Sequence, residues 1–149
     1  ESLAIVTRVS PADPEIQQVF EESKARLPKQ GRVDEISSPM LLAATSLSGT
    51  FCKKMIANDS ALPAASRRAH HDVDFADQTL AFNRGQRTTV IGEYARLFWQ
   101  RPATDHELDS LLETFGYESE QRILSLAERT KLLLLGCTAT ASSINSLLF

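Results

Sequence analysis

The stretch from Tyr94 to Phe115, YARLFWQRPATDHELDSLLETF, constrains the fold more than any other part of the chain. It contains the end of one amphipathic helix, a break at Pro102 and a second amphipathic helix. Thr104 and Glu107 have the spacing of a capping box, in which each side chain binds the other residue's backbone N–H. Gly116 then provides a stop signal. The stretch predicts a helical hairpin, and it indicates no particular chemistry.

The rest of the chain shows the same helical periodicity. Further helices are expected from Asp13-Pro14, from near Ser37 to about Ala57, from near Gln86, and from about Ser119 past Leu135. Residues 1–10 are rich in β-branched side chains and precede a proline, which favours an extended arm. We therefore predict an all-α fold: a compact bundle of five to six helices over residues 11–149, forming a single helical domain, with an extended N-terminal arm over residues 1–10.

Length and charge restrict the functional classes. A chain of 149 residues can bury a single core, and its net charge of −3 comes from interspersed acids and bases. This balance lacks the basic footprint of a nucleic-acid-binding protein, so we expect no nucleic-acid partner. No apolar run approaches the length that crosses a bilayer, so we expect no membrane span.

The two cysteines lie in comparable settings. Cys52 and Cys137 each fall on the apolar stripe of a predicted long helix, so each should point into the core. They either pair with each other or remain two buried thiols, because free cysteine behaves as a small hydrophobic residue. A bridge needs a close geometry that sequence does not give, and it would imply an oxidising compartment. The residues alone leave both alternatives open.

A polar cluster, His70, His71, Asp72 and Asp74, is the one candidate for metal chemistry. Adjacent residues on a helix point in different directions, so a metal would need a ligand from elsewhere, such as His106. The sequence has no HExxH, paired CxxC, EF-hand or GxSxG motif and no glycine-rich phosphate loop. We expect a polar helix end with Asp74 as an N-cap, and no metal, cofactor or catalytic residue.

Several arginines and aromatic residues are candidates for binding. One group of arginines either surrounds an anionic group or lies on ordinary solvated faces; its members are Arg67, Arg68, Arg84 and Arg87. Phe98 and Trp99 are adjacent on a helix, so we expect one in the core and the other in a partial surface contact. The interface candidates are Trp99, because tryptophan is enriched at binding hot spots, the neighbouring Arg101, and Phe149 in the apolar C-terminal turn.

The segment LFWQRPATDHELDSLL resembles a stretch in helical domains of large secreted bacterial proteins, which in planctomycetes and their relatives are often fused to cytochrome c. The closing GCTATASSINSLLF is similar to the ending of the same domains. The matching positions are Tyr94, Phe98, Arg101, Pro102, Thr104, Glu107, Leu108, Cys137, Thr138, Ser142 and Ser143. The resemblance covers about half of the chain. It implies a bacterial extracytoplasmic setting, which favours the disulfide, but no haem, because CxxCH is absent, and no catalytic residue.

These observations lead to an expected function. We expect a non-enzymatic structural or protein-interaction subunit of a periplasmic or extracellular bacterial assembly, with protein partners and self-assembly through the N-terminal arm. One alternative is a ligand-binding or accessory module of a larger secreted redox or enzyme system, with the His70–Asp74 region and nearby arginines lining a pocket. An intracellular regulatory domain is a third.

Overall fold

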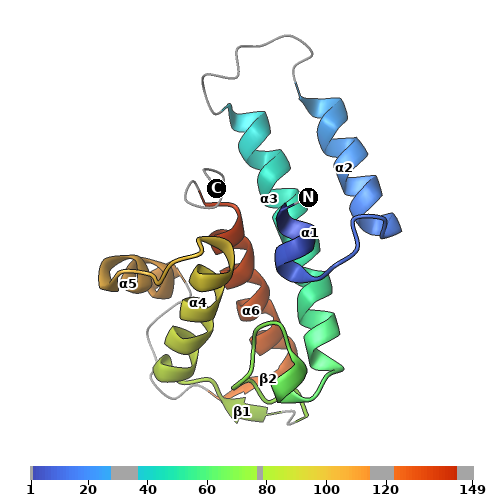
Figure 1. Cartoon of the computed structure of the whole chain (residues 1–149). Coiled ribbons are helices and arrows are strands. Elements are labelled where there is room, and N and C mark those ends of the chain that lie inside the picture. Colours follow the sequence, from blue (N-terminus) through green and yellow to red (C-terminus); the bar gives the residue numbers. More distant parts are fainter. Residues whose placement is uncertain (1, 28–36, 77–78, 115–122, 144–149) are drawn as a thin grey trace.

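The computed structural model describes residues 2–27, 37–76, 79–114 and 123–143 (Figure 1). The described part is mostly helical, with two short strands, which confirms the all-α prediction. Its elements are α1 (Ser2–Thr7), α2 (Pro14–Arg26), α3 (Ser38–Ser60), the 3-10 turn η1 (Ala64–Ser66), β1 (Thr79–Ala81), α4 (Arg84–Phe98), α5 (Asp105–Thr114), β2 (Ile123–Ser125) and α6 (Leu126–Ala141).

The centre of the molecule is the contact between α3 and α6, which run in opposite directions with α4 on the other side of α6 (Figure 1). Gly49 lies at this contact, but a Cβ there would sit 3.7 Å from Oγ1 of Thr138 on α6, an ordinary van der Waals distance, so the packing does not require a glycine. The side chains with almost no exposure include Cys52, Met55, Tyr94, Leu133 and Cys137.

Capping signals place most helix starts where the sequence predicts them. Asp13 accepts a hydrogen bond from the backbone N–H of Glu15 at the start of α2, and Pro14 occupies the first helical turn. The predicted capping box before α5 is present, because the Glu107 carboxylate accepts from the Thr104 N–H at 2.9 Å. Similar boxes start α4 and α6, so local side-chain chemistry sets these boundaries.

The extended conformation predicted for residues 1–10 is wrong. Ser2–Thr7 forms α1, whose Leu3 and Val6 pack against the core of the bundle. Arg8 has a φ of 55°, a left-handed conformation that ends the helix. Packing of apolar residues at helical spacing therefore outweighs the preference of β-branched residues for strands.

The start predicted for the last helix is also wrong. Ile123–Ser125 forms β2, which pairs antiparallel with β1, and α6 begins only at Leu126. Leu80 of β1 is paired with Leu124 of β2 in this two-stranded sheet. The pairing joins segments far apart in the chain, so local periodicity cannot reveal it.

One part of the molecule extends away from the rest. Figure 1 shows α2 and the first half of α3 side by side as a helical hairpin that projects beyond α4, α5 and α6. Among the described helices, none is long and apolar enough to span a membrane.

Candidate interaction surface

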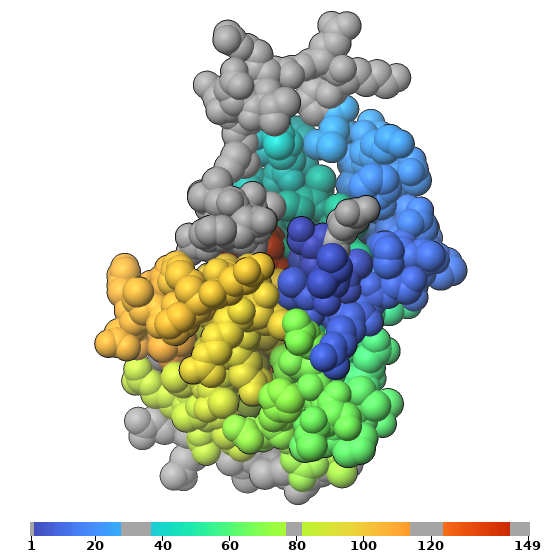
Figure 2. Space-filling model, viewed as in Figure 1, coloured from blue at the N-terminus to red at the C-terminus, as the bar shows by residue number. Residues whose placement is uncertain are grey.

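An apolar groove lies at the base of the projecting hairpin. It has a volume of about 720 Å³ and is lined by residues of α1, α2 and α3 together with Phe98, Gln100 and Ala141. Most of its lining is apolar, including Leu3, Val6, Ile16, Phe20, Leu47 and Phe51, and none of its lining side chains is charged. In Figure 2, the blue surface of α1 and α2 borders a hollow that has the teal surface of α3 behind it. We call this feature the α1–α2–α3 groove.

The first half of α3 is unusual for a surface helix because it has no charge. No charged residue occurs between Ser37 and Cys52. On the projecting hairpin, four large apolar side chains are exposed: Phe20 by 46%, Met40 by 36%, Leu41 by 41% and Leu42 by 69%. We call these four the projecting apolar residues. A helix that lacks a charged face is ordinarily buried. Because this half of α3 is exposed instead, it is the strongest candidate for a binding surface.

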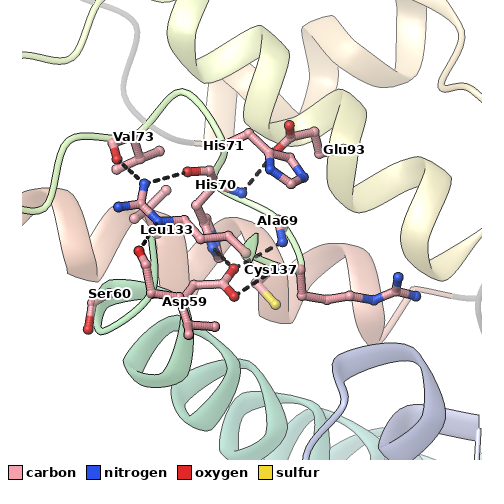
Figure 3. Close-up of polar contacts among 12 residues, drawn as sticks. Asp59, Ser60, Ala69, His70, His71, Val73, Glu93, Leu133 and Cys137 are labelled. Atoms are coloured by element: carbon pink, nitrogen blue, oxygen red, sulfur yellow. Dashed lines mark hydrogen bonds and ion pairs between the residues drawn. The ribbon is translucent and has the colours of Figure 1, made fainter. Parts of the chain in front are cut away.

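A buried polar network lies below this surface. The imidazole of His70 is 0% exposed; its Nδ1 lies 2.8 Å from Oδ2 of Asp59 and its Nε2 lies 2.5 Å from the hydroxyl of Tyr94. The Tyr94 hydroxyl is also 3.1 Å from the carbonyl oxygen of Leu133, to which it can donate. Figure 3 shows Asp59 of α3 pointing toward His70, with Glu93 of α4 beyond it. The network joins α3, α4, α6 and the loop that carries His70.

The protonation of this network follows from its contacts. Burial acts to raise the pKa of the Asp59 carboxyl, but hydrogen bonds from His70 and from the backbone N–H groups of Arg68 and Ala69 outweigh burial and hold the pKa below its ordinary value. Burial, with the nearby negative charge of Glu93 and Asp59, raises the pKa of Tyr94 well above 10. Asp59 is therefore ionised and Tyr94 neutral at neutral pH, sealed from solvent, which suits a structural role.

The predicted polar cluster does not come together as one site. His70 is buried, whereas His71 is exposed and its Nδ1 lies 3.0 Å from the carbonyl oxygen of Ala64. Asp74 accepts from the N–H of Ala76 at 2.8 Å, but the next two residues, Phe75 and Ala76, are not helical, so its predicted role as an N-cap is wrong. Within the described residues, no group of three or more His, Cys, Asp or Glu side chains could hold a metal ion.

The predicted arginine group is also divided among separate structural tasks. Arg67 donates to the carbonyl oxygens of Leu62, His70 and Val73, and Arg68 donates to that of Val6 at 2.6 Å. These two arginines tie the loop to itself and to α1.

The other two arginines lie at α4. Arg84 forms an ion pair with Asp109 of α5 at 3.1 Å, and the buried Arg87 donates to the carbonyl oxygen of Phe82 at 2.7 Å. The four arginines therefore do not surround one anionic group.

The partial surface contact predicted for one of Phe98 and Trp99 is wrong. Both Phe98 and Trp99 are buried, with 6% and 4% exposure, and the indole Nε1–H points toward the carbonyl oxygen of Thr140 and the hydroxyl of Ser143. The reason is that α4 ends at Phe98 and Gln100 has a φ of 54°. The chain therefore leaves the helical path at Trp99, and the indole turns toward the end of α6 instead of toward solvent.

Arg101 is partly exposed, but its main contacts lie within the chain. Its guanidinium lies 5.2 Å from the Trp99 ring centroid and binds both carboxylate oxygens of Glu107, at 2.9 and 2.6 Å. Arg101 and the Thr104 N–H lower the pKa of Glu107 from 4.5 to about 2. Arg101 thus closes the turn between α4 and α5. Phe149, the third interface candidate, lies outside the described residues.

The cysteines are joined. Cys52 of α3 and Cys137 of α6 form a disulfide with a Cα–Cα distance of 5.8 Å, and both residues are 0% exposed. The alternative of two free buried thiols is therefore wrong, and the described residues contain no free cysteine.

No protein-family model, curated protein or solved structure matches this chain. Within the segment that carries the resemblance, Arg101, Thr104 and Glu107 form the capping and ion-pair contacts of one turn, so they act as folding signals. The groove and the polar network were not identified by sequence reasoning. The uncharged run between Ser37 and Cys52 was the available signal for the groove, whereas nothing local identifies Tyr94 as the partner of His70.

Proposed function

We propose that this chain is a non-enzymatic structural or protein-interaction subunit of a bacterial extracytoplasmic assembly. The observation that carries the proposal is the uncharged, projecting half of α3, with Leu41 41% and Leu42 69% exposed. Large apolar side chains that cluster on a surface, next to a groove without charged lining, favour a partner that removes them from water.

The polar groups favour a structural role over catalysis. His70 is buried between Asp59 and Tyr94, and the hydrogen bonds of Arg67 go to three backbone carbonyls. Both side chains therefore stabilise the loop, and the imidazole of His70 has no access to a substrate, whereas a catalytic acid or base needs to reach the reacting group.

The proposed extracytoplasmic setting rests on two observations. The Cys52–Cys137 disulfide is compatible with an oxidising compartment, where such bridges persist. The resemblance of the LFWQRPATDHELDSLL segment to domains of secreted bacterial proteins favours the same setting.

Chemical crosslinking in the native cells tests this function. A Leu41→Glu/Leu42→Glu double variant should lose the protein crosslinks that the wild type makes, because each glutamate places a charge in the proposed contact. Leu135→Glu is the matched control, because Leu135 is also an exposed leucine, at 46%, but lies on α6. Identical crosslinks for all three proteins would contradict an interaction role for the projecting hairpin.

The α1–α2–α3 groove favours one alternative, a ligand-binding module. Its volume of about 720 Å³ lies in the range of small-molecule pockets. Because no charged side chain lines it, its ligand would be apolar and uncharged. Saturable binding of the neutral fluorescent probe N-phenyl-1-naphthylamine, abolished by the groove-filling variant Ala44→Phe, would support this alternative. Binding unchanged by Ala44→Phe would exclude the groove as the site.

A further inference from the structure

We propose that the partner of the projecting hairpin is a second copy of this chain, and that two α2–α3 hairpins pack about a two-fold axis into a four-helix arrangement. This inference rests on the proposed function and names the partner at that surface. Four-helix packing of two hairpins is a common way for helical chains to bury apolar faces.

The uncovered part of α3 follows from helix lengths. α3 has 23 residues and α6 has 16. Thr138 of α6 lies beside Gly49 of α3, and α6 ends three residues later, at Ala141. Because the two helices run in opposite directions, the first turns of α3, which carry Met40, Leu41 and Leu42, extend beyond the end of α6 (Figure 1).

Charge favours an identical partner at this surface. A surface usually selects a partner of different sequence through complementary charges, whereas two copies of the same charged surface repel each other. No residue between Ser37 and Cys52 is charged, so two α3 helices can meet without placing like charges together. A two-fold contact also requires that one patch supplies both protruding and recessed parts. Phe20 meets this requirement, because it is 46% exposed and also lines the groove.

The size of the hairpin predicts a dimer of modest affinity. α2 has 13 residues, which correspond to a helix about 20 Å long, and two neighbouring helices present a face about 20 Å wide. Such a face has a footprint of about 400 Å², about half of the roughly 800 Å² that each partner contributes to a standard-size interface. We expect a dissociation constant in the micromolar range, so both monomer and dimer should be detected when the protein concentration is varied across that range.

Sedimentation equilibrium between about 1 and 200 µM tests the proposal on the full chain with its disulfide intact. The wild type should change from monomer to dimer over this range, and the unfolding temperature should rise with concentration. Leu41→Glu/Leu42→Glu should weaken association at least tenfold. Leu135→Glu, and Ile5→Glu on α1, where the side chain is 74% exposed, should leave it unchanged. Circular dichroism of each variant shows whether the helices are retained.

Several outcomes would overturn the inference. A wild type that stays monomeric at 200 µM excludes a second copy, and so does a dimer that only Ile5→Glu disrupts. If removal of residues 144–149 turns a monomeric wild type into a dimer, the chain's own end is the occupant. A monomer whose crosslinks in native cells still depend on Leu41 and Leu42 would leave the proposed function intact and assign the surface to another protein.

Discussion

The hydroxyl of Tyr94 connects three parts of the molecule. Tyr94 lies on α4 and has no exposed surface. Its phenol oxygen also contacts His70 in the loop and Leu133 on α6, neither of which is near Tyr94 in the chain. Helical periodicity predicts that a side chain is buried, but it does not predict which buried polar atom will meet its hydroxyl.

Replacing Tyr94 with phenylalanine removes only this oxygen. We expect Tyr94→Phe to lower the free energy of unfolding by about 1–3 kcal/mol, because Nε2 of His70 then lacks a partner in a buried site. Urea denaturation monitored by circular dichroism measures this change. Thr89→Val, which removes an exposed hydroxyl from the same helix, is the control and should alter stability by less than about 0.5 kcal/mol. Equal effects of the two variants would contradict a special role for the network.

Glu107 should give the stability of the protein a specific pH dependence. Because its pKa is lowered from 4.5 to about 2, its contribution is complete above pH 4.5 and is lost as the pH falls toward 2. After allowance for solvent screening, we expect Glu107→Gln to cost about 1 kcal/mol at pH 7 and almost nothing near pH 2. Urea midpoints of wild type and variant at several pH values test this convergence. Glu113→Gln, an exposed change on the same helix, should not reproduce it.

Single residues show how far sequence reasoning extends. The apolar stripes place Cys52 and Cys137 correctly in the core, but only their Cα–Cα distance of 5.8 Å shows that they are joined. Trp99 was misjudged because a helical wheel assumes that the helix continues, whereas α4 ends immediately before it. Helical periodicity therefore predicts correctly which side chains are buried inside a helix, but it fails for the residues at the helix end.

At the scale of elements, the helices that carry explicit capping residues are the best predicted. The capping box of α5 was read from Thr104 and Glu107, and α2 starts at Asp13-Pro14 as expected. The start of α6 was missed because β2 occupies the residues before Ser125, and strand pairing is not visible to a local pattern. α1 was missed because its six residues gain their helical conformation from packing against the core.

The cap of α6 makes a measurable prediction. Ser125 accepts from the Glu128 N–H at 3.3 Å, and the Glu128 carboxylate accepts from the Ser125 N–H at 2.9 Å. Ser125→Ala should therefore reduce the free energy of unfolding by about 1 kcal/mol, which lowers the melting temperature by about 2–4 °C. Differential scanning calorimetry measures the shift. Ser66→Ala, at an exposed position outside the α-helices, is the control; a similar shift there would argue against the capping role.

At the scale of the whole molecule, the disulfide joins the two helices that form the centre of the bundle. Cys52 and Cys137 are separated by 85 residues, and closing a loop of this length removes much of the entropy of the unfolded chain. We expect the Cys52→Ala/Cys137→Ala variant to lose about 4–5 kcal/mol in free energy of unfolding.

Urea titration with and without a phosphine reductant checks this expectation. Reduced wild type serves as the second measurement, because it loses the covalent bond without the side-chain volume that alanine removes. The two proteins should agree within about 1 kcal/mol. A reduced wild type as stable as the oxidised form would contradict the proposed contribution of the bridge.

The position of the disulfide also determines how the protein responds to mechanical force. A tension applied between the two ends of this chain passes through residues 1–52, crosses the sulfur–sulfur bond and continues along residues 137–149. The segment between the cysteines, with α4, α5 and the His70 network, bears none of that load. Stretching would therefore act on α1 and the projecting hairpin before the segment between the cysteines, so a contact made through that hairpin would yield before this segment unfolds.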